Sequence, residues 1–347
     1  MKVLQVGPSP QAKGGISSFI ANLLPSLEAS QVPYIFLSTY LDGFYFSTYL
    51  RSIIGFLGLL PSFSILHIHS ASRGSFYRKS FFVLISKLFG KKVILHYHGG
   101  ALESFYNKSP GLLQRYISFV LRLPDRVLVL GPQWLGVLNK ICPSARGQVL
   151  THFVPSYLSP GVGKESNRIL FLGRIEKSKG VYDLLQAFVE LQAVQETMNW
   201  TLTVAGEGGE EQRVRERFGH FNNIEFRSWV SDQKKREILS RADIIVVPSY
   251  REALGLVILE AYSTGTAVIA SDVGGIPHIV KHGFNGFLFP PGDIQQLAEY
   301  LRLLCSDRGL LTSIQQNNLS VYHKLYHGQR YMSKLKQLYA DMDYESG

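Results

Sequence analysis

The chain has 347 residues, of which 46% are hydrophobic and 18% charged, and this composition predicts a packed core and argues against intrinsic disorder. That length is long for one domain and suits two of ordinary size. The longest apolar run, Ile53 to Leu60, is far short of the ~20 residues that a membrane-spanning helix needs. The chain starts directly with a strand-like segment, so we expect no signal peptide, and two cysteines without a CxxC motif favour a reducing cytoplasm.

The net charge of +10 is unevenly distributed along the chain. Residues 1–165 carry 16 Lys and Arg against 5 Asp and Glu, whereas residues 166–347 are nearly balanced. The densest basic stretch, Arg73 to Lys92, interleaves its cations with aromatic and aliphatic residues. Such a segment favours contact with an anionic membrane surface or an acidic ligand, although an ordinary helix with one solvated face would look similar. No helix-turn-helix, zinc-finger or RNA-binding signature supports nucleic acid as a partner.

Strand-like and helix-like segments alternate throughout the sequence. Helical patterns such as Val181–Gln192 and Lys234–Arg241 fill the gaps between short apolar runs. This alternation predicts an α/β protein with doubly wound, mostly parallel sheets. The expected strands are Val3–Val6, Tyr34–Leu37, Ile65–His69, Val93–Tyr97, Arg126–Leu130, Arg168–Leu172, Trp200–Ala205, Ile224–Phe226, Ile244–Val247, Ala267–Ala270 and Gly286–Phe289.

The segment 155–167 interrupts this alternation. It is rich in Pro, Gly and Ser and coincides with the change in charge, so it is the best candidate for an interdomain linker. We therefore expect one domain at 1–160 and a second at 165–320.

A basic loop follows the first strand of the second predicted domain. Gly173 and Gly180 allow the backbone to turn and to approach a ligand closely, and Arg174 and Lys179 place two cations on the same loop. A guanidinium and an ammonium can together neutralise a diphosphate.

Two glutamates flank the start of a predicted helix. Glu252 follows the strand that ends at Pro248, and Glu260 lies in the helix that runs from Leu256 to Ser263. The N–H groups at the start of such a helix attract phosphate, and carboxylates accept hydrogen bonds from hydroxyl groups. This combination suits a sugar nucleotide, although a glutamate pair at this spacing is more often a solvated helix face.

Read together, these segments resemble the retaining glycosyltransferases of family 4, which have the GT-B superfold. The resemblance is strong over residues 168–300 and weak over residues 30–120. It implies two Rossmann-like doubly wound domains that face a central cleft, with a last helix, at about 325–347, that crosses back to the first domain. The matching positions of the second domain, in the family's order and spacing, are Gly173-Arg174, Lys179-Gly180, Pro248-Ser249, Glu252, Gly255, Glu260-Ala261, Gly265-Thr266, Gly274-Gly275 and Asn285-Gly286. The resemblance extends into the first domain through Gly14-Gly15 and Asp125-Arg126.

The resemblance also implies roles for single residues. Arg174 and Lys179 would bind the donor diphosphate and stabilise the leaving group, and Glu260 would hold the nucleotide ribose. Glu252 would hold hydroxyl groups of the donor sugar. The family also implies donor-binding positions at Gly15, Gly173, Leu254, Gly255 and Leu256. It uses neither a metal nor a cofactor, so the nucleotide sugar would be a substrate.

Two His-x-His pairs form the other notable pattern. His67 with His69, and His96 with His98, each lie on one face of a predicted strand, so a zinc site is a conceivable alternative. No acidic or cysteine ligand stands nearby in the sequence, and we favour packing in the sheet for His67 and His96. His98 resembles the family's first-domain histidine that faces the donor sugar, and we expect it to act near the catalytic centre.

Three positions depart from the family's pattern. His278 stands where the second glycine-rich loop usually has Glu, His152 lies in place of an Asn-containing turn, and Leu254 replaces Phe. These departures affect the expected choice of donor sugar. Elsewhere, Gly206-Glu-Gly-Gly209 lacks the last glycine of a dinucleotide motif, and Asp341-Met-Asp343 lies in a polar tail.

The sequence therefore predicts a glycosyltransferase that moves a sugar from a nucleotide donor to a glycan or a polyprenyl-phosphate-linked acceptor with retained configuration. We expect a role in surface polysaccharide biosynthesis, at the cytoplasmic face of the inner membrane, which the basic first domain would contact. A sugar-nucleotide epimerase with the same superfold, or a non-catalytic protein that binds sugar nucleotides or glycans, is the alternative.

Overall fold

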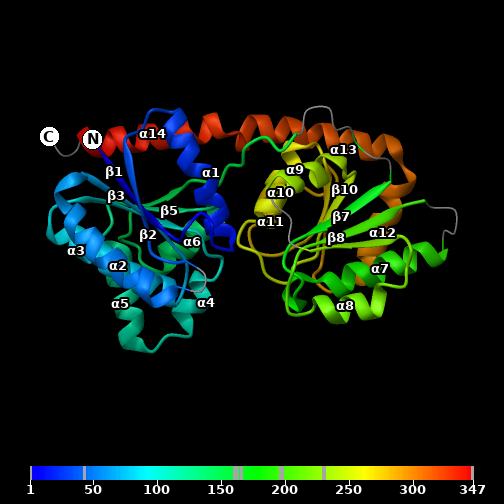
Figure 1. Cartoon of the computed structure of the whole chain (residues 1–347), viewed down its shortest axis with the longest axis horizontal. Helices are drawn as coiled ribbons and strands as arrows, with labels where there is room; N and C mark the ends of the chain where they lie inside the picture. Colours follow the sequence, from blue (N-terminus) through cyan, green and yellow to red (C-terminus); the bar gives the residue numbers. More distant parts are fainter. Residues whose placement is uncertain are drawn as a thin grey trace. The chain divides into compact units, whose positions relative to one another are not determined.

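A computed structural model of the chain describes residues 2–41, 44–158, 164, 167–194, 199–228 and 232–344. The chain divides into two compact units (Figure 1). The N-terminal unit comprises Met1–Phe153 and Gly328–Gly347, and the C-terminal unit comprises Val154–His327. The sequence prediction placed these boundaries at 160–165 and about 325, and most of the expected linker lies outside the described residues.

The N-terminal unit is built on a six-stranded parallel sheet in the order β2-β1-β3-β4-β5-β6. Its strands are β1 (Val3–Gly7), β2 (Tyr34–Ser38), β3 (Ile65–Ser70), β4 (Lys92–Tyr97), β5 (Arg126–Val129) and β6 (Gly147–Val149). Both faces of β1, β3 and β4 are buried, and the polar residues on these strands, such as Gln5, His67 and His69, are buried as well. The short strand β6 was not predicted from the sequence.

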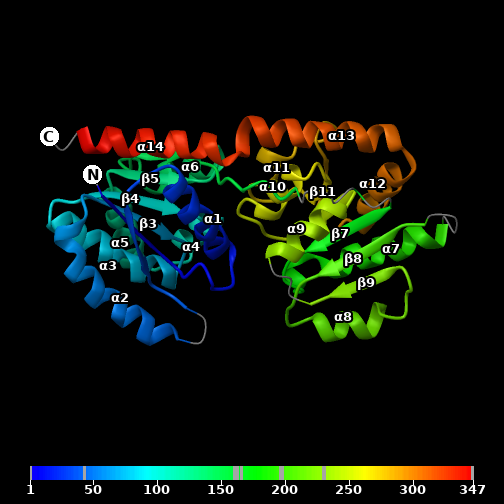
Figure 2. The same ribbon diagram turned by 45° about the horizontal axis from the view of Figure 1, so that its top comes forward.

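Helices cover both faces of this sheet (Figures 1 and 2). They are α1 (Gly15–Ala29), α2 (Tyr45–Leu59), α3 (Gly74–Leu88), α4 (Leu102–Asn107), α5 (Gly111–Arg122), α6 (Pro132–Ile141) and the last helix, α14 (Gly328–Tyr344). Helix α14 lies beside α1, and its Tyr339 is fully buried in this unit.

The C-terminal unit repeats this plan with a second six-stranded parallel sheet, in the order β12-β11-β10-β7-β8-β9. Its strands are β7 (Arg168–Leu172), β8 (Thr201–Ala205), β9 (Ile224–Arg227), β10 (Ile244–Val247), β11 (Ala267–Ser271) and β12 (Phe287–Phe289). Its helices are α7 (Val181–Val194), α8 (Glu211–Phe218), α9 (Asp232–Arg241), α10 (Leu256–Ser263), α11 (Ile276–Ile279), α12 (Ile294–Ser306) and α13 (Arg308–Val321). The doubly wound α/β prediction is confirmed in both units.

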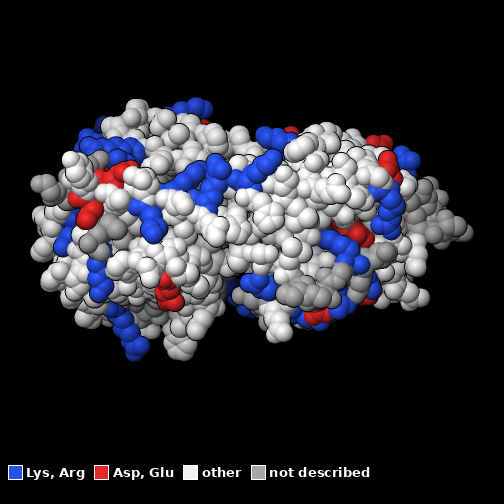
Figure 3. Space-filling model, turned by 90° about the horizontal axis from the view of Figure 1, so that it is seen from above, with Lys and Arg blue, Asp and Glu red and all other residues white. Residues whose placement is uncertain are grey.

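Within the described residues, none of the helices combines the length and the apolar character needed to cross a membrane. On the face shown in Figure 3, Lys and Arg side chains form several separate groups with uncharged surface between them.

Candidate functional site

The candidate site of the C-terminal unit lies at the carboxyl ends of three neighbouring strands. Strands β11, β10 and β7 are adjacent in the sheet, so the loops that follow them meet at one edge. The Tyr250 N–H donates to the carbonyl of Ser178 over 3.0 Å, which joins two of the loops. The Gly275 N–H donates to the carbonyl of Glu252 over 3.4 Å and joins the third.

Two glycines allow the loops to pack this closely. Gly180 has φ +66°, and a Cβ atom there would lie 1.9 Å from the carbonyl oxygen of Pro248. Gly274 has φ +57°, and a Cβ atom there would lie 1.7 Å from the carbonyl oxygen of Glu252. Because neither position can hold a larger residue without moving the opposite backbone, the glycines fix the spacing of the loops that carry Lys179 and Glu252.

Lys179 and Glu252 form an ion pair across two of these loops. Lys179 Nζ lies 2.6 Å from Glu252 Oε2, and the two side chains are 24% and 19% exposed. The sequence assigned these residues to different parts of a ligand, the diphosphate and the sugar. The structure brings them together, so each restrains the other at the edge of the sheet.

Arg174 lies on the same loop as Lys179 but is more exposed. Its Nη1 donates to Glu176 Oε1 over 2.7 Å, and its side chain is 63% exposed. A pair this open to solvent contributes little to stability, so the guanidinium can be redirected toward an anionic ligand at small cost.

The loop after β8 supports the backbone beneath this basic loop. The Ile175 N–H donates to the carbonyl of Glu207 over 3.0 Å. A Cβ atom at Gly206 would lie 1.8 Å from the Gly173 carbonyl oxygen, and one at Gly208 would lie 2.3 Å from that of Ile175. The Gly-x-Gly sequence therefore serves close backbone packing in this unit.

Glu260 is the most deeply buried carboxylate of the candidate site. Its side chain is 4% exposed, and Oε1 accepts from Lys235 Nζ over 2.6 Å. The Lys235 ammonium also lies 5.0 Å from the centroid of the Tyr157 ring. A buried carboxylate needs a compensating charge, and α9 provides it. Lys235 could not be predicted from the sequence, because no local pattern connects it with a residue in α10.

The N-terminus of α10 lies between the two glutamates. Gly255 precedes the helix with φ +81°, a conformation that glycine adopts without strain. The first N–H groups of the helix, at Leu256 and Val257, have no acceptor within the helix, and the helix dipole favours an anion there. Leu254 is 3% exposed, so only its main chain could touch a ligand.

His278, one of the departures from the family's pattern, lies in the short helix α11. Burial, followed by the nearby charge of Lys281, lowers its pKa below the usual value. A neutral imidazole therefore stands where the family usually has a carboxylate, which changes both the charge and the hydrogen-bonding capacity of this loop.

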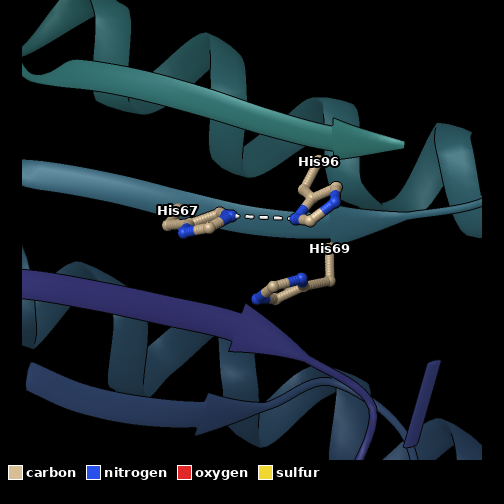
Figure 4. A group of neighbouring side chains, drawn as sticks. All are labelled: His67, His69 and His96. Carbon is tan, nitrogen blue, oxygen red and sulfur yellow. Dashed lines mark hydrogen bonds between the residues drawn. The ribbon is translucent and has the colours of Figure 1, made fainter. Parts of the chain in front are cut away.

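The N-terminal unit contains a cluster of five buried histidines on one face of its sheet: His67, His69, His96, His98 and His152. Figure 4 shows three of them, with His67 Nε2 joined to His96 Nδ1 over 3.3 Å. His98 is 2.9 Å from His69, through Nε2 and Nδ1, and 2.6 Å from His152, through Nδ1 and Nε2. Phe19 of α1 covers the cluster, with its ring stacked on that of His152.

The hydrogen bonds of this cluster determine which ring nitrogen of each histidine carries a hydrogen. Gln5 Nε2 donates to Tyr339 Oη, so Gln5 Oε1 accepts from His69 Nε2–H. His69 Nδ1 then accepts from His98 Nε2–H, and His98 Nδ1 accepts from His152 Nε2–H. The result is a one-directional chain of neutral imidazoles.

A second branch starts at the same tyrosine. Tyr339 Oη donates to His67 Nδ1 over 2.6 Å, and His67 Nε2–H donates to His96 Nδ1. His96 Nε2 and His152 Nδ1 are buried and have no hydrogen-bond partner among the described residues. Burial lowers the pKa of all five histidines, that of His96 to about 3.

The nitrogen atoms of His67, His69 and His96 lie within 4.8 Å of one another, as do those of His96, His98 and His152. In a tetrahedral zinc site with Zn–N bonds of about 2.0–2.1 Å, ligand nitrogens are roughly 3.3 Å apart. The separations of 2.6 and 2.9 Å at His98 are hydrogen-bond lengths. We therefore interpret the chain from His69 through His98 to His152 as a hydrogen-bonded network. Metal independence stays a prediction.

His98 is the predicted near-catalytic residue, and the structure gives both of its ring nitrogens a histidine partner. One partner is His152, the residue that departs from the family's usual asparagine. A contact between the His98 imidazole and a substrate would require one of these bonds to break. Gly15, the other predicted site residue of this unit, is exposed at the start of α1.

Comparisons with known proteins link part of the chain to glycosyltransferases. Residues 159–321 match the family model described as Glycosyl transferases group 1. An uncharacterized glycosyltransferase from Methanocaldococcus jannaschii is 32% identical over 170 residues, which cover 48% of this chain and 43% of the relative. The alpha-maltose-1-phosphate synthase of Mycobacterium tuberculosis is 35% identical over 182 residues, with the same coverage. The chain thus spans less than half the length of these curated relatives.

Solved structures share the whole fold. A sucrose-phosphate synthase from Thermosynechococcus elongatus superposes with a TM-score of 0.81 at 16% identity, covering 99% of both chains. Anabaena HepE in complex with UDP-glucose gives a TM-score of 0.75 at 17% identity, covering 98% of this chain and 100% of HepE. The fold is GT-B, and the matched region supports the glycosyltransferase family.

Proposed function

We propose that this protein is a retaining glycosyltransferase that takes its sugar from a nucleotide-sugar donor. The observation that carries the proposal is the meeting of Lys179, Glu252 and the N-terminus of α10 at one sheet edge, with the buried Glu260 in the same helix. The match of this region to group 1 glycosyl transferases and the UDP-glucose complex of the fold neighbour HepE support it.

The proposed chemistry follows from these charges. When the bond between the anomeric carbon and the diphosphate breaks, its electron pair goes to the departing phosphate oxygen. Arg174, Lys179 and the N–H groups at Leu256 stabilise that charge without a metal ion. An acceptor hydroxyl group then bonds to the anomeric carbon on the same face and passes its proton to the departing phosphate oxygen, which retains the configuration.

The remaining groups hold the donor. Glu260 accepts hydrogen bonds from the ribose, while Lys235 keeps the buried carboxylate in place. Glu252 accepts from hydroxyl groups of the sugar, and the diphosphate replaces it as the partner of Lys179. Gly15 and His98, which belong to the other unit, keep the roles that the family resemblance implies.

For the acceptor, we propose a glycan or a polyprenyl-phosphate-linked sugar of surface polysaccharide biosynthesis, met at the cytoplasmic membrane face. The basic excess of the first half of the sequence supports an anionic acceptor or surface.

The proposal is tested with a panel of nucleotide sugars, first by thermal shift and then by release of nucleoside diphosphate. A bound donor raises the melting temperature by mass action. We expect one donor to stabilise the chain and to be consumed with a membrane extract as acceptor, in the presence of EDTA. Conversion of the donor to an epimer without an acceptor would identify an epimerase, and binding without turnover would identify a binding protein.

A further inference from the structure

The outer helical layer of the N-terminal unit is formed by α2, α3 and α5. The chain moves in the same direction across the sheet from β2 to β3, β4 and β5, so right-handed crossovers place the three helices on one face. The Phe56 ring of α2 packs on Phe82 of α3, and Tyr77 of α3 stacks on Tyr116 of α5. The three helices lie side by side in Figures 1 and 2.

Helix α2 presents an apolar stripe to the outside. Phe46, Leu50, Ile54 and Leu57 are 74%, 49%, 67% and 46% exposed. Their spacing of four, four and three residues puts them on one side of the helix, away from the buried Ser52 and Phe56. A surface helix normally turns polar side chains outward, so this stripe indicates an interaction surface.

The apolar surface continues on the neighbouring helices. Leu88 at the end of α3 is 78% exposed, and Phe89 follows it at 58%. On α5, Leu112 and Phe119 are 80% and 42% exposed. All three helices of the layer therefore turn large apolar side chains toward solvent.

The charged side chains of these three helices are all basic. None of the three helices contains Asp or Glu, and each contains Arg or Lys. Arg51, Arg115 and Arg122 are exposed, and Arg115 and Arg122 share the outer side of α5 with Leu112 and Phe119. The nearest acidic residues along the chain are Asp42, three positions before α2, and Asp125, three positions after α5, and Asp125 is paired with Lys87 of α3.

The exposed cations of this layer differ from the lysines of the segment Arg73–Lys92, on which the prediction from the sequence rested. Lys79 is 5% exposed and donates to Ser75 Oγ, Lys87 pairs with Asp125 over 2.8 Å, and Lys91 donates to the Phe63 carbonyl. These three lysines thus hold the unit together, and the exposed arginines within the three helices are Arg51 on α2 and Arg115 and Arg122 on α5.

We propose that the layer of α2, α3 and α5 is a docking surface for an anionic lipid membrane. The stripe Phe46, Leu50, Ile54 and Leu57 inserts among the headgroups, and Arg51, Arg115 and Arg122 bind lipid phosphates. The charge favours a lipid surface over a second copy of the chain, because two copies would bring like charges together. The inference rests on the proposed function for its lipid-linked acceptor and adds the surface that would bring the enzyme to it.

The test is flotation of the full chain with vesicles of phosphatidylcholine, with and without 30% phosphatidylglycerol, where the ~30% anionic fraction gives a negative surface potential. We expect binding to the anionic vesicles. The double variant Leu50→Gln/Ile54→Gln and the double variant Arg115→Gln/Arg122→Gln should each weaken it about tenfold or more. Leu303→Gln on α12 and Arg213→Gln on α8, at exposed positions of the other unit, are matched controls that should bind like the wild type.

Two results would overturn the proposal: a wild-type chain that stays off anionic vesicles, and variants that bind as well as their controls. A chain that sediments as a dimer without vesicle binding, and becomes monomeric on Leu50→Gln/Ile54→Gln, would assign the layer to self-association instead. Turnover of a soluble donor is measured on the same samples. Lost vesicle binding with retained turnover supports the docking surface, whereas absent turnover in the wild type bears on the proposed function alone.

Discussion

The two units differ in the kind of polar side chain that they place near the carboxyl ends of their strands. In the C-terminal unit these side chains are charged. They form ion pairs between loops and are partly exposed, as Lys179 and Glu252 are. The N-terminal unit buries five neutral histidines and joins them through Gln5 and Tyr339. Paired, accessible charges can exchange one partner for a ligand, whereas a buried neutral network resists any change of protonation.

The largest expected effect is therefore on the acid stability of the N-terminal unit. The pKa of each cluster histidine is lowered by burial, so the unfolded chain binds more protons than the folded chain below pH 6.5. The stabilisation is present above pH 6.5 and is lost as the pH falls. Each histidine lowers the free energy of unfolding by about 1.4 kcal/mol per pH unit, and all five together lower it by up to about 7 kcal/mol per pH unit. Lys79, with its pKa lowered to about 7, is mostly protonated in both states below pH 6.5, so it adds a slope of the same sign only above that pH.

Hydrogen exchange followed by mass spectrometry at pH 7.5 and 5.5, corrected for intrinsic rates, measures this difference by region. Peptides of the N-terminal unit should lose protection well before those of the C-terminal unit. His96→Phe should reduce the pH slope by about one proton, and His323→Phe, at an exposed position of the C-terminal unit, should not change it. Equal loss of protection in the two units would contradict the assignment of the acid sensitivity to the cluster.

The next largest effect is expected for the ion pair between Lys179 and Glu252. Lys179→Ala should reduce donor turnover about 10²–10³-fold, because it removes a cation from the developing charge of the leaving group. The free energy of unfolding should change little, since the pair is partly exposed. Steady-state kinetics with the identified donor gives the first quantity and urea unfolding the second. The control is Lys177→Ala, an exposed lysine of the same loop, and near-normal turnover in Lys179→Ala would remove the diphosphate assignment.

A smaller effect is expected at the buried pair. Glu260→Gln should weaken donor binding about tenfold, because a charged acceptor for the ribose hydroxyls becomes a neutral one. Isothermal titration calorimetry measures the affinity, and Glu237→Gln in α9 is the control, since its carboxylate pairs with Lys234 on the helix surface. If the two variants bind the donor equally well, Glu260 pairs with Lys235 and stabilises the fold but does not bind the ribose.

Structure could be predicted from the sequence where the signal was local. Apolar runs predicted eleven of the twelve strands in the described part of the chain, and the motifs around Lys179 and Glu252 lie on loops whose positions follow from the parallel strand order. Contacts between residues distant in the chain could not be predicted. Lys235 reaches Glu260 from another helix, and the pairing of His98 with His152 joins residues 54 positions apart. The inward position of Lys79 could not be read from a helix whose apolar residues lie on both faces.

The central claim is that the loop cations and the start of α10 bind the diphosphate of a nucleotide sugar. The most direct test is titration calorimetry of the preferred nucleoside diphosphate, and of the same nucleoside without phosphate, into the wild type and into Arg174→Gln/Lys179→Gln. We expect the double variant to lose tenfold or more in affinity for the diphosphate and to bind the nucleoside as the wild type does. Unchanged affinity for the diphosphate, or an equal loss for both ligands, would contradict the claim.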